Sequence, residues 1–339
     1  MIETLKVQNY KSLKNIEIPL KPLTVLVGPN AAGKSNILDC LAFLSEIGTY
    51  RPATAEINQS FNKRGGYTDM VWGGRKQDHI SISCQWQPWG YSQESFEYSL
   101  AIQEAQPGYP VFSVLEELLS ARVPRVGESS FKLRDGTLLI GNSSQSVAPY
   151  ENLLSHQENP VIQSVQKVIS SWTFYDFITQ TMRSTQPIAK QTHIRSDGSN
   201  VATLLHWIFS EERKLFSQVE EHLKAAIPEV DELMSPLTED GKTYVAWREK
   251  DIPGRIPAWN MSEGSVRLVA ILLGLLVPQP PPLVTFENPD LHLHAHLMQY
   301  LAEILKAGSR HSQVIITTHS PYLLDHIPPE SVLIVWKEA

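Results

Sequence analysis

The sequence is poor in cysteine and in long apolar runs, and each shortage excludes a class of protein. Only Cys40 and Cys84 are present, so at most one disulfide can form, which excludes a disulfide-built secreted scaffold. The longest apolar run, Leu268 to Val277, is too short to span a bilayer. The first residues carry charge where a signal peptide needs an apolar core. We therefore expect a cytoplasmic protein with no membrane partner.

Basic residues are also outnumbered. The 29 Lys and Arg face 36 Asp and Glu, a net charge of -7, so the chain is not a general polyanion binder. The hydrophobic share of 42% excludes a disordered or fibrous chain. Binding to DNA would need a local basic surface. The basic residues that stand out are scattered, a pattern typical of solvated surface: Lys63, Arg64, Arg75, Lys76, Arg122 and Arg125.

Apolar patterning predicts strand, glycine loop and helix at the start of the chain and an antiparallel region after it. Strands are predicted over 2–8, 15–20 and 23–27, then a helix with apolar residues from Ile37 to Ile47. Residues 51–76 are polar and glycine-rich, which predicts irregular structure. Alternation predicts strands over 79–86, 95–102 and parts of 110–150, with Asp135-Gly136 as a hairpin turn.

The second half is predicted to form helices followed by an α/β pattern. Residues 151–230 are predicted helical, with residues 197–200 as the N-terminal cap of a helix over 201–209 and an amphipathic helix over 211–226; residues 243–247 are predicted to form a strand. Ser262 is predicted to begin a long apolar helix. Strands over 283–286, 313–317 and 331–336 alternate with helices over 295–307 and 321–326. That order predicts a largely parallel sheet.

The loop between the third strand and its helix fits a phosphate-binding pattern. Residues 28–35, Gly-Pro-Asn-Ala-Ala-Gly-Lys-Ser, match G-x-x-x-x-G-K-[ST]. Backbone amides of such a loop and the N-terminus of the next helix face phosphate oxygens, the lysine reaches the β- and γ-phosphates, and the serine hydroxyl ligates Mg²⁺. The alternative is a glycine turn without a ligand. The candidate nucleotide-binding residues are Asn30, Ala31, Ala32, Gly33, Lys34, Ser35 and Asn36.

A phosphate-binding loop of this type needs an acidic partner for the metal at the end of another strand. Leu283–Phe286 is an apolar strand that delivers Glu287 to the carboxyl edge of the sheet. Ser35 and Glu287 are therefore the candidate Mg²⁺ ligands. The competing interpretation of Glu287 is an exposed glutamate at a strand end. The separation of some 250 residues excludes a small kinase or GTPase.

Four stretches resemble the ABC-type ATPases of the RecF, SMC and Rad50 group, and more closely the stand-alone ATPases of the AAA_15 and AAA_21 type. They are residues 9–12 with the phosphate loop, the signature-like stretch 261–267, the acidic stretch 286–294 and the switch-histidine stretch 315–321. The resemblance implies an α/β P-loop ATPase head. Its mixed β/α nucleotide-binding lobe would comprise 1–105 and 265–339, and an inserted, largely helical arm lobe would comprise 106–264.

The resemblance also implies roles for single residues. Ser262 and the backbone of Gly264 would contact the γ-phosphate of ATP held by a second copy, and His319 would contact the γ-phosphate in its own copy. Lys11 would bind the nucleotide. Each has an alternative: Ser262 as a plain helix cap, His319 as a core histidine, and Lys11 as a solvated turn lysine. The Q-loop of the family has no clear match; Gln77 and Gln85 are the candidates.

One position departs from the common pattern. After Glu287 most ABC ATPases place a glutamate that polarises the attacking water, and this chain has Asn288. An amide orients water but does not accept its proton. We therefore expect slow ATP hydrolysis, with Glu287, Asn288 and His319 as the catalytic candidates and Asp290 or His294 as helpers.

Two further groups of residues suggest sites, but simpler interpretations are favoured for both. His292, His294 and His296 alternate, which suggests a metal site, yet the resemblance places them in a loop and a helix start. The tryptophans at 72, 86 and 89 favour core packing over a base-stacking surface.

The leading hypothesis is an ATP-gated homodimer that binds ATP and Mg²⁺ and acts in DNA repair or anti-phage defence. DNA and a separate nuclease or other effector protein are the candidate partners, because no nuclease-like segment follows the ATPase motifs. One alternative is an ATP-dependent scaffold or sensor with negligible turnover, which Asn288 favours. Another is the motor subunit of an ABC transporter, which the signature and the middle region weigh against.

Overall fold

The computed structural model divides into two compact units. The first comprises Met1–Pro22, Gly28–Trp172 and Val335–Ala339, and the second comprises Leu23–Val27 and Thr173–Ile334. The residues that the structure describes are 1–49, 55–87, 94–105, 112–123, 127–141, 143–148, 151–277 and 279–337.

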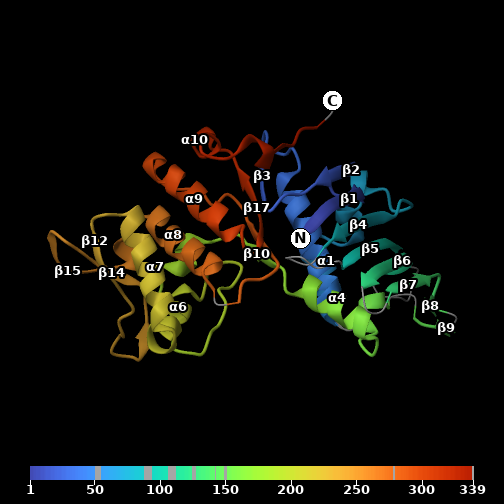
Figure 1. Ribbon diagram of the computed structural model, residues 1–339, viewed down its shortest axis with the longest axis horizontal. Coiled ribbons are helices and arrows are strands. Elements are labelled where there is room, and N and C mark those ends of the chain that lie inside the picture. Colours follow the sequence, from blue (N-terminus) through green and yellow to red (C-terminus); the bar gives the residue numbers. More distant parts are fainter. Residues whose placement is uncertain are drawn as a thin grey trace. The chain divides into compact units, whose positions relative to one another are not determined.

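The first unit is built on an antiparallel sheet (Figure 1). Its strand order is β2 (Leu13–Pro19), β1 (Ile2–Tyr10), β4 (Ile80–Trp86), β5 (Ser95–Glu104), β6 (Phe112–Val123), β7 (Gly127–Arg134), β8 (Thr137–Ile140) and β9 (Ser143–Ser146). Alternate residues of β4 and β5 are buried, as expected of a sheet with one face in a core. The antiparallel prediction is confirmed, and so is the Asp135-Gly136 turn, whose residues both have positive φ.

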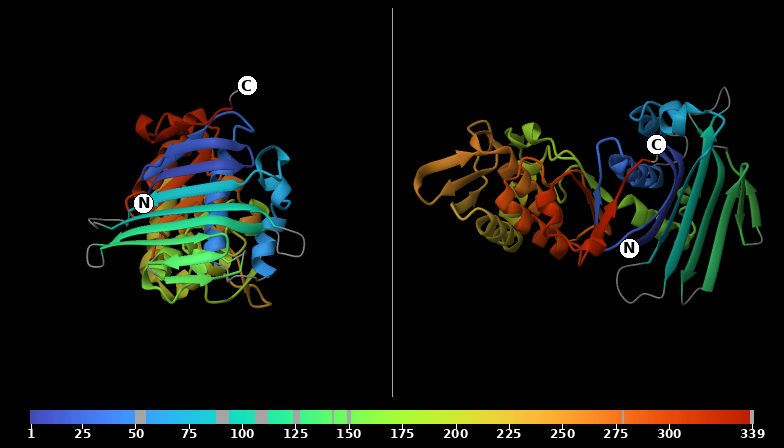
Figure 2. Two further views of the ribbon diagram at one scale, coloured as in Figure 1. Left: turned by 90° about the vertical axis from the view of Figure 1, so that its right-hand side faces the viewer. Right: turned by 90° about the horizontal axis from the view of Figure 1, so that it is seen from above.

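Helices of the first unit cover one face of this sheet (Figure 2). The helix α1 (Lys34–Thr49) packs against α4 (Pro160–Ser170). Gly48 allows their close approach, since a Cβ there would stand 3.2 Å from the Ile169 side chain. The 3-10 helix η2 (Leu153–Ser155) is attached to β6, where the buried Glu117 accepts the Leu153 amide at 2.7 Å.

The region after α1 differs from the sequence prediction. Residues 55–74 form α2 (Ala55–Asn62), α3 (Tyr67–Met70) and the 3-10 helix η1 (Trp72–Gly74), so the prediction of irregular structure was wrong there. Phe61 and Tyr67 are buried, and Phe61 stacks on Phe112 of β6 at 4.7 Å between ring centroids. Packing against the sheet therefore stabilises helices that the polar composition of residues 51–76 does not predict.

The second unit contains a parallel sheet, as predicted. Its order is β10 (Thr173–Tyr175), β16 (Leu283–Phe286), β17 (Gln313–Thr318), β3 (Leu23–Val27) and β18 (Val332–Ile334), and every pairing is parallel. The long apolar helix α8 (Glu263–Leu275) and α9 (Met298–Gly308) pack with it in one core, and α10 (Pro321–Leu324) follows β17 (Figure 1). The 3-10 helices η4 (Ala295–Leu297) and η5 (Pro329–Ser331) are short connections.

The remaining part of the second unit joins helices to small sheets. It contains α5 (Thr179–Met182), α6 (Val201–Glu211), α7 (Arg213–Ala226), the pair β11 (Gln186–Pro187) and β13 (Lys242–Thr243), a sheet of β12 (Val230–Met234), β14 (Ala246–Glu249) and β15 (Ile252–Pro257), and η3 (Ala258–Asn260). The helices predicted over 201–209 and 211–226 are confirmed. The strand predicted over 243–247 is two strands instead, β13 and β14.

Two features of this unit escaped the sequence prediction. β10 lies in a region predicted to be helical, and its short run pairs with β16. Asn200 stands before α6 without a side-chain capping bond, because its Oδ1 accepts the Arg195 amide instead. Within the described residues, no helix has the length and apolarity needed to cross a bilayer. The proposed division into nucleotide-binding and arm lobes is functional, and it stays a prediction.

Candidate functional site

The phosphate-loop pattern lies where the sequence places it, directly after β3 and at the start of α1. Gly28, Ala31 and Gly33 have φ of 156°, 60° and 113°. The last two lie in the left-handed region, so the loop curls rather than extends, a conformation that turns successive amides to one side. Lys34 is buried, and its Nζ donates to the carbonyls of Gly28 and Pro29 at 2.8 and 3.0 Å. The loop and its lysine thus form one compact structure.

Neighbouring backbone and side chains fix the two glycines. A Cβ on Gly28 would overlap the carbonyl oxygen of Val335, so only glycine fits there. A Cβ on Gly33 would stand 3.0 Å from the Ser12 Oγ, which in turn accepts a hydrogen bond from Asn36 Nδ2 at 2.7 Å. The β1–β2 turn therefore lies against the phosphate loop and the first turn of α1.

Lys11 belongs to this turn. It has a φ of 49°, and its Nζ pairs with Asp39 Oδ2 of α1 at 2.6 Å. Its side chain is one quarter exposed, so the alternative of a freely solvated turn lysine does not describe it. Sequence reasoning named Lys11 but missed Asp39, whose only signal was a carboxylate among the buried apolar positions of α1.

Glu287 and Asn288 follow the fully buried strand β16. The Glu287 amide donates to the Tyr175 carbonyl of β10 at 2.8 Å, which holds the strand end in register. Asn288 has a φ of 45°, and its amide donates to Thr317 Oγ1 of β17 at 3.0 Å. Asparagine tolerates the left-handed region better than glutamate does. The backbone therefore supplies a conformational reason for the amide at this position.

Asp290 and His319 lie beyond the ends of β16 and β17. Burial raises the pKa of Asp290, against a hydrogen bond from Thr318 and the charges of His319 and Arg267. Its Oδ1 is buried without a hydrogen-bond partner among the described residues. His319 is exposed, so it is not the core histidine that was its alternative. A carboxyl of raised pKa beside an exposed histidine is suited to moving a proton.

The signature-like stretch forms the N-terminus of α8. Ser262 is the exposed N-cap; its Oγ accepts the Ser265 amide at 3.1 Å and lies 2.7 Å from the Ser265 Oγ. Gly264 is buried, and a Cβ there would overlap the His292 carbonyl oxygen. A helix N-terminus with an exposed hydroxyl is chemically suited to an anion. The same observation describes a plain helix cap, so the γ-phosphate role stays a proposal.

Two arginines that the sequence reasoning did not assign hold this helix end. Arg267 is buried and donates from Nη2 to the Phe177 carbonyl at 3.0 Å. Burial lowers the pKa of Arg267, against the charges of Asp176, Asp290 and Glu263. Arg183 donates to the carbonyl of Met261, the residue before the cap. The position of Ser262 is therefore fixed by polar contacts on both sides.

The alternating histidines contact Glu263 and one another. His292 pairs with Glu263 at 3.1 Å, and the Nδ1 atoms of His294 and His296 lie 2.8 Å apart. Among the described residues, no group of three or more His, Cys, Asp or Glu side chains is arranged to hold a metal.

Of the three tryptophans, Trp86 is part of the core, as predicted. Trp72 is half-buried between Lys14 and Arg75, with the cations 4.8 and 5.0 Å from its ring. Trp89 lies outside the described residues. Gln77 and Gln85 are exposed, and neither acquires a role.

Most of the basic residues that stand out in the sequence, among those that the structure describes, pair with a carboxylate. Arg64 is buried, so the prediction of a solvated arginine was wrong there. Its neighbour Lys63 pairs with Glu46, Lys76 with Glu104 and Arg122 with Glu128. Arg125 lies outside the described residues.

The proposed metal ligands suit magnesium. Ser35 is exposed in the first turn of α1, and Glu287 is half-buried at the carboxyl end of β16. A hydroxyl and a carboxylate supply the hard oxygen donors that Mg²⁺ takes beside nucleotide phosphates. The donor chemistry therefore fits the ion.

Comparison with known families decides the class. The AAA_21 profile, described as "AAA domain, putative AbiEii toxin, Type IV TA system", matches residues 151–325, half of the chain. This protein belongs to the AAA_21 family. A second AAA-domain profile, AAA_23, matches residues 4–85, which include the phosphate loop. The family is one of ATPase domains.

Curated relatives agree with this class. An OLD nuclease of Thermus scotoductus is 23% identical over the whole chain, and the chain spans 62% of its length. The Retron Vc95 probable ATPase of Vibrio cholerae is 19% identical over 98% of the chain and 73% of its own length. The DNA replication and repair protein RecF of Corynebacterium jeikeium is 33% identical over 15% of the chain and 12% of its own length.

A solved structure shows the fold. A crystal structure of an Smc head bound to the C-winged helix domain of ScpA has a TM-score of 0.57, with 16% identity, over 99% of this chain and 94% of that one. This protein therefore has the fold of a P-loop ABC-type ATPase head, as the sequence predicted.

Proposed function

We propose that this protein binds Mg-ATP, dimerises on it and hydrolyses it slowly. The observation that carries the proposal is the curled loop of residues 28–33 with the buried Lys34 at the start of α1. Amides of this loop would bind the phosphates, with Lys34 exchanging its carbonyl partners for phosphate oxygens. Ser35 and Glu287 would hold Mg²⁺, which neutralises phosphate charge.

The second half of the proposal concerns dimerisation. Ser262 stands exposed at the N-terminus of α8, tethered from both sides by Arg183 and Arg267. In a dimer this end would contact the γ-phosphate held by the other copy, and His319 would contact it within its own copy. Closure would then depend on ATP, because only ATP offers a γ-phosphate to both partners.

The slow turnover rests on Asn288. Its amide would orient the attacking water but not accept the proton, so proton removal falls to a weaker arrangement such as Asp290 and His319. A long-lived ATP-bound state follows. The alternative function, an ATP-dependent scaffold or sensor with negligible turnover, is favoured by the same residue, whose left-handed backbone disfavours glutamate.

One experiment tests both halves. Purified Glu287→Gln protein would be examined by light scattering with Mg-ATP, Mg-ADP and no nucleotide. We expect a dimer with Mg-ATP alone, and none in the Glu287→Gln protein that also carries Lys34→Ala. A protein that binds Mg-ATP but stays monomeric refutes the dimer. Phosphate release by the wild type, with Lys34→Ala as background, separates slow hydrolysis from negligible turnover.

The pathway is proposed from the relatives. The names OLD nuclease, retron ATPase and RecF suggest a role in DNA repair or anti-phage defence. The chain spans 62% of the OLD nuclease, and we propose that this ATPase acts together with a partner effector protein. A DNA mobility shift with and without ATP at two salt concentrations would test direct DNA binding.

A further inference from the structure

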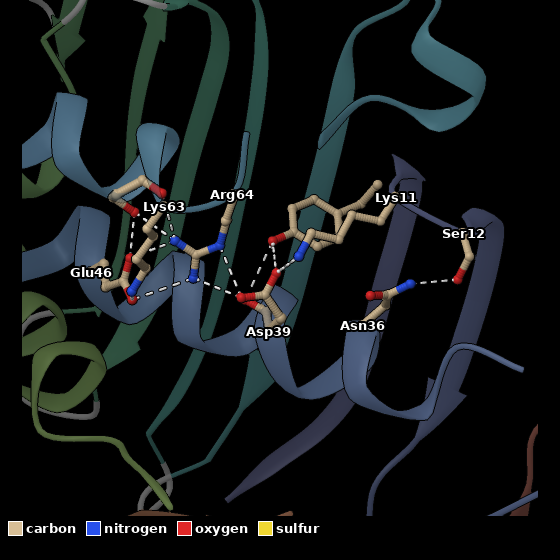
Figure 3. Close-up of polar contacts among 9 residues, drawn as sticks. Lys11, Ser12, Asn36, Asp39, Glu46, Lys63 and Arg64 are labelled. Carbon is tan, nitrogen blue, oxygen red and sulfur yellow. Dashed lines mark hydrogen bonds and ion pairs between the residues drawn. The ribbon is translucent and has the colours of Figure 1, made fainter. Parts of the chain in front are cut away.

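One carboxylate of α1 receives three donors from three different residues. Asp39 accepts Arg64 Nε on Oδ1 at 2.9 Å, and on Oδ2 it accepts both the Tyr10 hydroxyl and the Lys11 ammonium at 2.6 Å (Figure 3). Burial alone would raise the pKa of Asp39, but the Arg64 charge and the bonds from Lys11 and Tyr10 lower it overall. Asp39 is therefore a stable anion at neutral pH.

Two of the three donors are fixed in place. The Arg64 side chain is 3% exposed, and it also binds Glu46 at 2.7 Å and the Ser60 carbonyl at 2.9 Å. Tyr10 is fully buried in β1. Lys11 differs, because its side chain is one quarter exposed and the ion pair with Asp39 holds it. Lys11 is thus the donor that can leave at least cost.

The departure of Lys11 would leave no carboxylate oxygen without a donor. Oδ1 would keep Arg64, and Oδ2 would keep the Tyr10 hydroxyl. An unpartnered buried oxygen is what makes the loss of a hydrogen bond expensive. The network therefore holds the anion in the same place whether or not the lysine is present.

The place where Lys11 is held is next to the phosphate loop. Ser12, its chain neighbour, accepts a hydrogen bond from Asn36 (Figure 3). The Ser12 hydroxyl also lies against Gly33 of the phosphate loop. Asp39 stands four residues after Ser35 on α1, which puts it one turn away, about 5–6 Å between Cβ atoms. A rotation of the Lys11 side chain would carry its ammonium group from the Asp39 carboxylate toward a phosphate bound at Ser35.

We propose that Asp39 is a positioning residue that holds Lys11 in reserve beside the phosphate loop and releases it to the phosphates of bound nucleotide. The inference rests on the proposed nucleotide binding. Asp39 and the phosphates compete for the Lys11 ammonium. The larger the fraction of molecules in which Asp39 holds Lys11, the weaker the apparent affinity for ATP. Arg64 and Tyr10 make the exchange reversible by keeping the Asp39 carboxylate hydrogen-bonded in its own site.

A double-mutant cycle tests the exchange. Binding of Mg-ATP and of AMP would be measured by calorimetry for the wild type, Asp39→Asn, Lys11→Met and the double variant. We expect Asp39→Asn to tighten ATP binding roughly three- to fivefold, the upper part of the range for a partly exposed ion pair. In the Lys11→Met background the same change should alter the affinity less than about twofold. AMP affinity should respond less than ATP affinity.

The sign of the effect separates positioning from damage. A purely structural role of Asp39 predicts weaker binding of every nucleotide and a lower melting temperature. Unchanged or weaker ATP binding by folded Asp39→Asn overturns the proposal, and so does an equal gain in the Lys11→Met background, which would mean direct repulsion between Asp39 and the phosphates.

A matched control and a second variant complete the test. Lys63 also pairs with a carboxylate of α1, Glu46, more than a turn beyond Asp39, so Lys63→Met should leave ATP affinity unchanged. If Asp39→Asn does not fold, Tyr10→Phe replaces it. Removing the hydroxyl makes Asp39 depend on Lys11, so ATP affinity should fall roughly two- to threefold, and only where Lys11 is present. If Tyr10→Phe leaves ATP affinity unchanged, or lowers it equally in the Lys11→Met background, the inference is overturned. A wild type that binds ATP independently of Lys34 would instead refute the proposed function.

Discussion

Replacing Gly264 by alanine should destabilise the N-terminal end of α8, and the structure allows the loss of stability to be worked out. A Cβ there would overlap the His292 carbonyl oxygen, stand 2.9 Å from its carbon and lie 3.2 Å from the Leu293 Cα. All three atoms are backbone, so no side-chain rotation relieves the contact. Overpacking of this kind costs about 1–3 kcal/mol, and alanine's better helix propensity recovers at most about 1 kcal/mol.

The same helix offers a matched control. A Cβ on Gly274 would stand 3.0 Å from the Tyr175 ring and 3.5 Å from the Phe286 ring. These are side-chain atoms that shift by a few tenths of an ångström, and the propensity gain offsets that cost. We expect Gly274→Ala to change the free energy of unfolding by less than about 0.5 kcal/mol, and Gly264→Ala to lower it by about 2 kcal/mol.

Urea unfolding, followed by tryptophan fluorescence, measures both variants against the wild type. The functional readout is the ATP-dependent dimer of the Glu287→Gln protein, which Gly264→Ala should abolish and Gly274→Ala should preserve, because displacing the helix start moves Ser262. Equal unfolding free energies for the two alanine variants would refute the reasoning. They would mean that a steric clash with backbone atoms costs no more than a close contact with side-chain atoms.

Two further predictions use single positions. Asn288→Glu should raise the rate of phosphate release at least about tenfold by restoring a proton acceptor, while the left-handed φ of 45° costs about 1 kcal/mol of stability; an unchanged rate at full folding contradicts the assigned role. Burial raises the pKa of Glu117 to about 7 from an ordinary 4.5. Because the folded state then binds a proton that the unfolded state has released, stability should fall as pH rises from 4.5 to 7 and level off above. Relative to Glu117→Gln, the wild type should lose about 2 kcal/mol between about pH 5.5 and pH 8 in urea unfolding; parallel pH profiles would contradict this.

The parts of the fold that the sequence predicted are those with a strong local signal. β3, the phosphate loop and α1 follow one another as predicted because the apolar strand, the two glycines and the helical period agree. α8 begins after Ser262 for the same reason: the cap residue and the apolar run mark the same boundary.

The parts that the sequence missed depend on distant contacts. β10 is too short to show a period, and its place is set by pairing with β16, far along the chain. α2 is polar on average, and its end is held by the buried Arg64 and by the stack of Phe61 on the sheet. Propensity is a weak prior that such tertiary contacts override.

The site shows the same division between residue type and residue role. The pattern identified Asn288 as a departure, but only the left-handed backbone explains why glutamate is disfavoured there. Likewise the pattern named Lys11, while the competition for it appears only when Asp39, Tyr10 and Arg64 are seen together. A side chain's partners across the fold decide its chemistry, and a linear motif does not record them.

The N-terminal end of α8 lies against the loop that follows β16, and this would bear on how ATP controls the protein in the proposed dimer. Gly264 meets the His292 backbone, and Arg267 of the same helix faces Asp290, which Thr318 also holds beside His319. In the proposed dimer, a displacement of the α8 start by the other copy would therefore also displace the loop that follows β16. Because the Gly264 contact is with backbone atoms, rotation of a side chain would not absorb such a displacement. This contact would connect closure of the proposed dimer with the residues around His319.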